Sequence, residues 1–179
     1  MKLWQRIFFS SFILIILAID ITMAVTLNMN FRTTVERETN RAALQNAYYA
    51  ENLRSQVVYR RLKDNRLRLP ADQVKELVEN MVKGQTAGKD TLVVCQPDGQ
   101  SIGEVKMGAA GLLTGEFKTR VVEENQMLSL IRESDSKSYI LIGAPAELEA
   151  ETYYIYTISD ISDIYKSLEQ QLRFAQLAS

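Results

Sequence analysis

This chain is constrained first by a long apolar run at residues 7–27, which follows Lys2 and Arg6 and precedes the polar segment 28–40. About 20 apolar residues, at a helical rise of about 1.5 Å each, match the roughly 30 Å hydrocarbon core of a bilayer. The run therefore predicts a helix that spans a membrane, and we assign residues 1–28 to a cytoplasmic tip and this span. The lipid bilayer is thus the first predicted partner of the chain.

A cleaved signal peptide is the alternative interpretation of this start. Its apolar region would be shorter, about 7 to 15 residues, and would end in a small-x-small cleavage site. Thr22-Met23-Ala24 fits that site poorly and the apolar run continues beyond it, so we favour an uncleaved anchor. Because Lys2 and Arg6 precede the run and the next basic residue is Arg32, the positive-inside rule predicts a cytoplasmic N-terminus and an extracytoplasmic body at the cell membrane.

Asp20 is an ionisable residue inside the apolar run. An ionised carboxylate near the centre of a bilayer costs about 2.5 kcal/mol or more, so such a residue needs an explanation. One interpretation is a polar contact between two such helices in a dimer. The other places Asp20 toward the outer side of the span, protonated or reached by water, and the sequence leaves both open.

The composition excludes several classes of function. Lys and Arg number 21 against 22 Asp and Glu, and a net charge of −1 gives no electrostatic basis for binding nucleic acid. The chain contains no histidine, which removes the usual general base and the commonest metal ligand. The single cysteine, Cys95, lies in an apolar run and is expected to be a buried thiol. We therefore expect no metal, no cofactor and no catalytic residues within these 179 residues.

Residues 29–62 contain neither proline nor glycine and are rich in good helix formers. Apolar and small residues recur there at helical spacings on roughly one side: Phe31, Val35, Ala42, Tyr49, Leu53 and Val57. This pattern predicts one long extracytoplasmic helix that continues from the membrane span. Its apolar side is expected to pack against the domain or against a second copy of the chain.

Residues 63–160 are predicted to form the core of the extracytoplasmic domain. A short helix begins at Ala71-Asp72, after Pro70, and ends at Gly84. Beyond it we predict a charged helix or loop at 123–133, an exposed acidic hairpin loop at 145–151, and a turn at Pro97-Asp98-Gly99. The five predicted strands are residues 91–95, 101–105, 117–122, 139–142 and 153–158. These elements predict an α+β fold with an antiparallel sheet.

The C-terminal segment, residues 161–179, has the most regular pattern in the chain. Asp160, Ser162 and Asp163 suit the start of a helix. Apolar residues then recur at spacings of four and three: Ile161, Tyr165, Leu168, Leu172 and Ala175. This pattern predicts a helix that runs to Ser179.

Two stretches, residues 91–103 (TLVVCQPDGQSIG) and 153–165 (YYIYTISDISDIY), are similar to parts of known sensor modules. The first resembles the opening hairpin of PAS-like or Cache-like domains, in which an Asp-Gly turn joins two strands. The second resembles the last strand and exit helix of membrane-bound kinases, where the strand ends in an aspartate-isoleucine-serine pattern. With the order of elements, the chain resembles the N-terminal sensory region of bacterial two-component sensor histidine kinases, a module that chemoreceptors and cyclic-dinucleotide enzymes also use.

The resemblance implies a homodimer that takes part in two-component signal transduction. It also implies that residues 161–179 form an exit helix that transmits the signal and leads toward a second transmembrane span beyond Ser179. The phosphoacceptor histidine, the ATP-binding boxes, the HAMP linker and the second span of those kinases are not in this sequence. Kinase activity is therefore implied only for a longer parent protein. We expect binding of a small-molecule or protein signal to shift the exit helix relative to the N-terminal helix, which takes a differential binding free energy of only a few kcal/mol.

The default ligand pocket of a PAS-like fold is the sheet face under the connecting segments. The resulting candidates for ligand binding are Arg120, Arg132, Tyr139, Tyr154 and Tyr156. The ordinary alternatives are packing for the tyrosines and a solvated charge for each arginine.

Two interpretations from other classes stay open. A pilin-like subunit also combines an apolar N-terminal helix, its amphipathic continuation and an antiparallel sheet, but a prepilin would show a glycine before the apolar run and a glutamate shortly after it. Here Arg6 precedes the run, and the first glutamate is Glu36. The other interpretation is a single-span extracytoplasmic binding or assembly protein, complete at Ser179, without kinase output.

Overall fold

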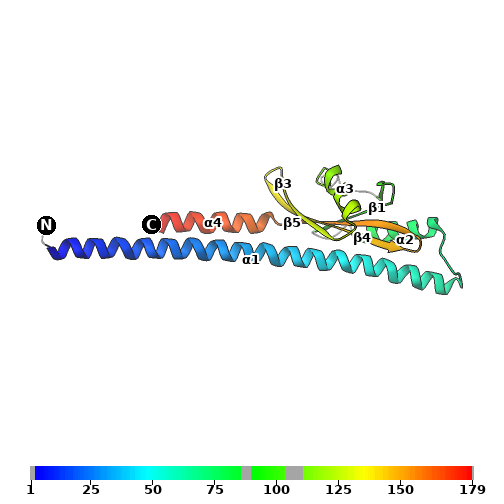
Figure 1. The fold of residues 1–179 in the computed structure, drawn as a ribbon, viewed down its shortest axis with the longest axis horizontal. Helices are drawn as coiled ribbons and strands as arrows, with labels where there is room; N and C mark the ends of the chain where they lie inside the picture. The colour runs from blue at the N-terminus through cyan, green and yellow to red at the C-terminus, as the bar shows by residue number, and fades with distance from the viewer. Residues whose placement is uncertain (1–2, 86–89, 104–110, 179) are drawn as a thin grey trace. The chain divides into compact units, whose positions relative to one another are not determined.

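The computed structural model describes residues 3–85, 90–103 and 111–178, and its fold is α+β (Figure 1). The described residues form four helices and one five-stranded antiparallel sheet. The chain divides into two compact units, residues 1–37 with 162–179, and residues 38–161. The predicted fold class, with a long N-terminal helix, a sheet of five strands and a C-terminal helix, is confirmed.

The N-terminal helix α1 (Leu3–Lys63) continues without a break for 61 residues. Its sequence lacks proline and glycine, each of which would cost about 1–3 kcal/mol in a helix interior. Its most apolar 18-residue window has a mean hydropathy of 2.4 and is not buried against other parts of the chain. Helix α1 is therefore long and apolar enough to span a membrane, although a signal sequence would share this length and composition.

In the unit 38–161 the strands follow the order β2-β1-β5-β4-β3, and every neighbouring pair is antiparallel. Their bounds are β1 (Asp90–Cys95), β2 (Ser101–Ile102), β3 (Leu128–Ser134), β4 (Lys137–Leu148) and β5 (Glu151–Asp160). Strand β5 is central, and it pairs with β4 over ten consecutive residues, from Tyr139 opposite Asp160 to Leu148 opposite Glu151.

The predicted turn between β1 and β2 is confirmed. The backbone N–H of Gln100 donates to Oδ1 of Asp98 at 2.9 Å. Gly99 has a φ of +84°, a left-handed conformation that glycine adopts without strain. The structure gives β2 only as far as Ile102, and residues 104 and 105 of the predicted second strand lie outside the described residues.

The predicted strand at 117–122 is wrong, because this segment lies in helix α3 (Gly115–Glu124). Oγ1 of Thr114 accepts the backbone N–H of Phe117 at 3.4 Å and caps the helix start. Asn125, with a φ of +47°, ends the helix in the left-handed conformation. The aromatic and β-branched residues of the segment favour a strand locally, but Phe117 and Val121 lie one helical turn apart and both are buried.

The predicted charged helix or loop at 123–133 is also wrong, since its second half belongs to β3. This strand pairs with β4 on one side only, and most of its residues are exposed or half-buried. An edge strand with little burial lacks the apolar alternation by which strands are recognised in a sequence.

The predicted hairpin loop at 145–151 is wrong as well, because β4 runs to Leu148 and β5 begins at Glu151. Only Glu149 and Ala150 form the turn. Pro145 is compatible with a strand here because β3 pairs with β4 only as far as Gly143. Beyond that point β4 has a partner on one side only, where a residue without an N–H is tolerated.

Both faces of the sheet are buried by helices, with α1 and α3 on opposite sides of it (Figure 1). Helix α1 and the predicted second helix, confirmed as α2 (Ala71–Gly84), pack on one face around Leu53, Val78 and Ile155. Helix α3 and the residues before it pack on the other face around Val121 and Leu141.

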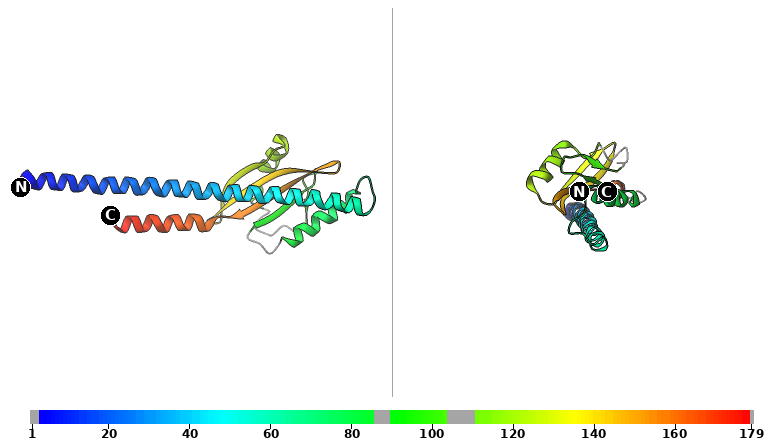
Figure 2. Two further views of the ribbon diagram at one scale, coloured as in Figure 1. Left: turned by 90° about the horizontal axis from the view of Figure 1, so that it is seen from below. Right: turned by 90° about the vertical axis from the view of Figure 1, so that its right-hand side faces the viewer.

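In the unit formed by residues 1–37 and 162–179, α4 (Ser162–Ala178) lies alongside α1 and runs antiparallel to it, as Figures 1 and 2 agree. The predicted C-terminal helix is thus confirmed. Asp163 lies in its first turn, whereas Asp160 is the last residue of β5. Ile161 alone separates the strand from the helix.

Candidate functional site

Helices α1 and α4 meet through an aromatic pair. The ring centroids of Phe31 and Tyr165 lie 5.0 Å apart at an interplanar angle of 82°, an edge-to-face contact. Such pairs add about 0.5–1.5 kcal/mol beyond the burial of their surface. Tyr165 is one of the predicted signal-transmitting residues, and through this ring pair it contacts α1 directly.

A surface groove of about 310 Å³ lies beside this aromatic pair, between the same two helices. Its apolar lining includes Leu27 and Leu168, and its polar lining includes Asn30, Thr34 and Asp163. These three polar residues are exposed, so the groove is open to solvent rather than enclosed.

The other predicted residues of the exit helix have different positions. Ile161 is only 2% exposed and belongs to the sheet-containing unit, where its backbone N–H donates to the carbonyl oxygen of Ser138 at 2.9 Å. Leu172 and Ala175 lie in α4, and their side chains are outside the described part of the chain. Asp20 lies on the exposed surface of α1, within the apolar segment.

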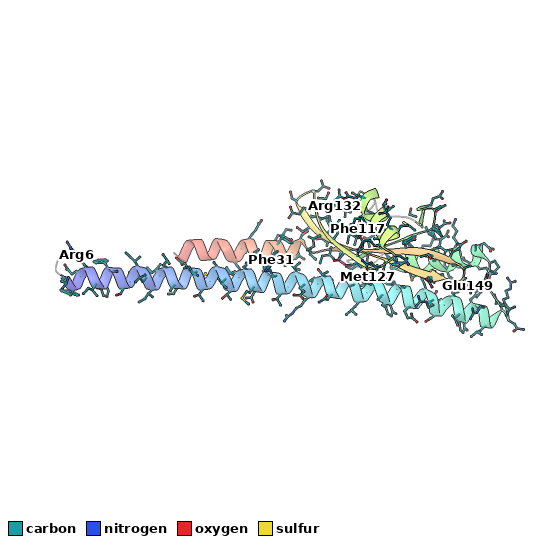
Figure 3. All side chains as sticks on the ribbon, in the orientation of Figure 1. Arg6, Phe31, Phe117, Met127, Arg132 and Glu149 are labelled. Carbon is teal, nitrogen blue, oxygen red and sulfur yellow. The ribbon has the colours of Figure 1, made fainter. Side chains whose placement is uncertain are left out.

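The strand register brings four of the five predicted ligand-binding residues to one face of the sheet. Arg132 pairs with Tyr139 across β3 and β4, and Tyr154 and Tyr156 alternate along β5 on the same side. This is the face that α3 covers (Figure 3). Arg120 is not part of this group, because it lies exposed on α3 and pairs with Glu124, Nη2 to Oε1, at 3.0 Å.

The tyrosines on this face are packed rather than open to solvent. Tyr156 is 1% exposed, and its ring centroid lies 6.2 Å from that of Phe117 on α3. Burial raises the pKa of Tyr156 well above its ordinary value. Arg132 donates from Nη1 to the carbonyl oxygen of Leu112 at 3.1 Å, which ties the segment before α3 to the edge strand. On this face the predicted residues hold α3 against the sheet.

On the opposite face, Asn46 of α1 makes a polar contact that the apolar pattern of the helix did not reveal. Its side chain is fully buried, and Nδ2 donates to the carbonyl oxygen of Ile155 and to Oγ1 of Thr157, each at 3.0 Å. Nδ2 also lies 3.4 Å from the carbonyl oxygen of Ile142. Among the described residues Oδ1 of Asn46 has no hydrogen-bond partner. The residue fixes α1 on the central strands at the cost of one unsatisfied acceptor.

A smaller cavity, of about 80 Å³, lies between the β4–β5 turn and the start of α2. The side chain of Glu149 lines it, is only 10% exposed, and places Oε1 3.9 Å from Nη1 of Arg61. Tyr153, also in the lining, donates to Oε2 of Glu151 at 3.1 Å. This volume accommodates a few water molecules. Sequence reasoning missed the cavity because it assigned this turn to an exposed loop.

The described residues hold no group of three or more His, Cys, Asp or Glu side chains arranged around a metal ion. Cys95 is 1% exposed, and burial raises the pKa of its thiol, with Lys118 opposing this shift and Asp98 adding to it. A protonated, buried thiol is a poor nucleophile. Cys95 therefore contributes to the packing of the core between the sheet and α3.

Comparison with known proteins gives no relative on which to base an assignment. No family model matches this sequence, and no curated protein matches it.

Proposed function

We propose that this chain is the extracytoplasmic signal-sensing region of a membrane-bound sensor histidine kinase of a two-component system. In this proposal residues 1–28 form the cytoplasmic tip and the span, and the remainder lies outside the cell membrane. A longer parent protein supplies the kinase. Binding of a small molecule or a protein by the unit 38–161 displaces α4 relative to α1, and two copies act together as a homodimer.

The junction of α1 and α4 is the observation that carries this proposal. The edge-to-face contact of Phe31 with Tyr165 gives the two helices a defined arrangement. The open groove of about 310 Å³ beside it leaves the side chains that line it unconfined on their solvent side, which permits a second arrangement. If the free energies of two helix arrangements differ by only a few kcal/mol, a ligand that binds one of them more tightly can shift the protein toward that arrangement.

The chain between the sheet and α4 also supports displacement of the helix. Strand β5 is the central strand, and Ile161 is the single residue between its end and the start of α4. The backbone of Ile161 is bonded to Ser138 on β4, so the hydrogen bonds of the sheet extend to the residue directly before α4.

The test is a chimaera in which residues 1–178 replace the sensing region of a two-component kinase with a transcriptional reporter. One to four alanines are inserted after Gln171, so that each added residue turns the helix beyond it by about 100°. We expect reporter output to oscillate with the number of residues inserted and to return close to the parent value at four. Output that is indifferent to the insertions would contradict transmission through α4.

The coding sequence beyond Ser179 provides an independent test. A second apolar span, followed by a dimerisation helix that carries a histidine, is expected. A stop codon directly after Ser179 would favour the anchored binding or assembly protein, and a pilin-type operon context would favour the pilin-like subunit.

The proposed orientation is tested by cysteine labelling in intact cells. Cys95→Ala removes the native thiol, and Lys75→Cys adds one on the exposed surface of α2 in the unit 38–161. A membrane-impermeant maleimide should label this cysteine without lysis. Labelling only after lysis would place the body of the chain in the cytoplasm and overturn the proposed topology.

A further inference from the structure

The C-terminal half of α1 carries an exposed apolar stripe opposite its buried one. The stripe consists of Leu44, Tyr48, Tyr59 and Leu62, which are 73%, 62%, 68% and 70% exposed. Leu44 and Leu62 are separated by 18 residues, which is five helical turns, so they lie in line along the helix. The residues that α1 buries against the sheet lie on its other side: Ala42, Asn46, Tyr49, Leu53 and Val57.

The stripe is about as large as the largest apolar patch of a typical monomer, about 300–600 Å², and patches of that size often mark interaction sites. Tyr and Leu side chains are among the largest apolar groups, and four of them that are about two-thirds exposed present on the order of 500 Å². Pairing two such stripes would bury about 1,000 Å² in total, which reaches the lower limit for a specific protein interface.

We propose that this stripe is the surface through which two copies of the chain pair, with their α1 helices parallel and related by a two-fold axis. The proposal deepens the homodimer of the proposed function and relies on its membrane anchor. Two copies held by the same N-terminal segment in one membrane present the same helix in the same direction. A two-fold interface then places the stripe of one copy against the same stripe of the other copy.

The polar residues within the stripe fit a parallel pair of helices. Ser55 is small, and it lies between Tyr48 and Tyr59 on the same side of the helix, where backbones can approach closely. Glu51 is held by Arg54 of its own chain, Nη1 to Oε2, at 3.0 Å. This pairing offsets the repulsion that two glutamates would experience across the axis, and the net charge of −1 adds little further repulsion.

Membrane anchoring makes a small interface sufficient. Copies confined to one plane meet at a high effective concentration, so modest intrinsic affinity produces extensive pairing. A lipid surface is a poorer occupant of the stripe, because Glu51 lies along it and its partner Arg54 lies on its flank, and both would have to be desolvated in the bilayer.

Disulfide scanning of the full chain in membranes tests the proposal. Single cysteines replace Leu44, Ser55 or Leu62 in a Cys95→Ala background, with Arg54→Cys on the flank of α1 and Lys75→Cys on the exposed side of α2 as controls. Under mild oxidation we expect the three stripe positions to form intermolecular disulfides at least tenfold faster than both controls. Equal rates at all positions, or the fastest rate at Lys75→Cys, would overturn the proposal.

Charge substitution gives the complementary measurement. Leu44→Glu combined with Leu62→Glu should raise the dissociation constant of the dimer in detergent at least tenfold, as measured by sedimentation. The matched control is Leu67→Glu, since Leu67 is 94% exposed and lies beyond the end of α1. A double variant that folds and remains dimeric would contradict the interface. The chimaera with alanine insertions reports on α4 alone, so failure of pairing and failure of signalling remain distinguishable.

Discussion

A Cβ atom added to Gly143 would lie 2.8 Å from Cε1 of Tyr156, closer than carbon atoms of folded proteins approach one another. The two residues are paired across β4 and β5, and the absence of a side chain on one strand makes room for the ring on the other. The same added atom would lie 2.7 Å from Cγ2 of Val121 on α3. Gly143 therefore sets how closely α3 packs on the sheet.

We expect Gly143→Ala to destabilise the unit 38–161 by about 1–3 kcal/mol, because an overpacked core forces side chains and backbone to shift. Pulse proteolysis in a urea series measures this change in the anchored chain. Gly84→Ala is the matched control, since nothing lies within 4 Å of a Cβ atom added there, and it should leave stability within about 0.5 kcal/mol. Equal effects at the two glycines would mean that Gly143 does not limit the packing of α3.

The buried amide of Asn46 should tolerate an apolar replacement better than a charged one. Asn46→Asp places an acceptor against the carbonyl of Ile155 and the hydroxyl of Thr157, and a loss of about 3–5 kcal/mol is expected at pH 7.5. Burial raises the pKa of the new carboxyl above its unfolded value of about 4, so the loss should shrink as the pH falls from 7.5 toward about 4 and should change little below that. Asn46→Leu removes both the donor and the unsatisfied acceptor and should cost less than about 2 kcal/mol.

Urea midpoints of the two variants at pH 4 and pH 7.5 measure this difference. Ala47→Asp, on the exposed flank of the same helix, controls for the effect of a new charge on α1. If Asn46→Leu were more damaging than Asn46→Asp, the hydrogen bonds of Asn46 would contribute more than its burial.

Cys95 should be inert in the folded chain. Its thiol is 1% exposed, and burial raises its pKa, so the reactive thiolate is scarce. We expect maleimide to label it at least 100-fold more slowly in buffer than in a denaturing concentration of urea. Cys95→Ala combined with Ser101→Cys moves the thiol to the exposed residue that pairs with position 95, and this thiol should react rapidly without urea.

The stability of the unit 38–161 should decline at high pH because of Tyr153. Burial, with the neighbouring Glu151, raises the pKa of this tyrosine from about 10 to about 12. Because the folded state holds the proton more tightly than the unfolded state, its contribution is fully present below pH 10 and is lost between pH 10 and 12. Urea midpoints between pH 9 and 11 should fall less steeply for Tyr153→Phe than for the parent, and Tyr59→Phe controls for the loss of a tyrosine elsewhere.

Elements with a strong local signal were predictable from the sequence. Helix α1 lacks helix breakers, α2 begins after Pro70 and carries an apolar face, and the β1–β2 turn has the Asp98-Gly99 pair. Strand β5 is apolar and β-branched along most of its length, and it was found within a few residues of its true ends. In each case local propensity and burial favour the same structure.

The errors occurred where tertiary contacts outweigh local propensity. The residues of α3 favour a strand by composition, and its caps at Thr114 and Asn125 were the available signal for a helix. Most residues of β3 are exposed or half-buried, so its sequence does not show which side faces the core. Pro145 can lie in a strand only because β3 stops pairing with β4 at Gly143, which the sequence does not show. The contacts of Asn46 and Gly143 join residues about 100 and 13 positions apart, which local patterns do not reveal.

The unsatisfied Oδ1 of Asn46 has a further consequence for how α1 is held on the sheet. A buried acceptor without a partner costs about 1–3 kcal/mol, so this contact is less stable than an apolar residue of the same shape would make it. The contacts of Nδ2 with three acceptor oxygens nevertheless define one rotation of the helix and one position along its axis relative to β4 and β5. The contact is thus locally frustrated: it specifies a single position for the helix while lowering the free energy required to leave it.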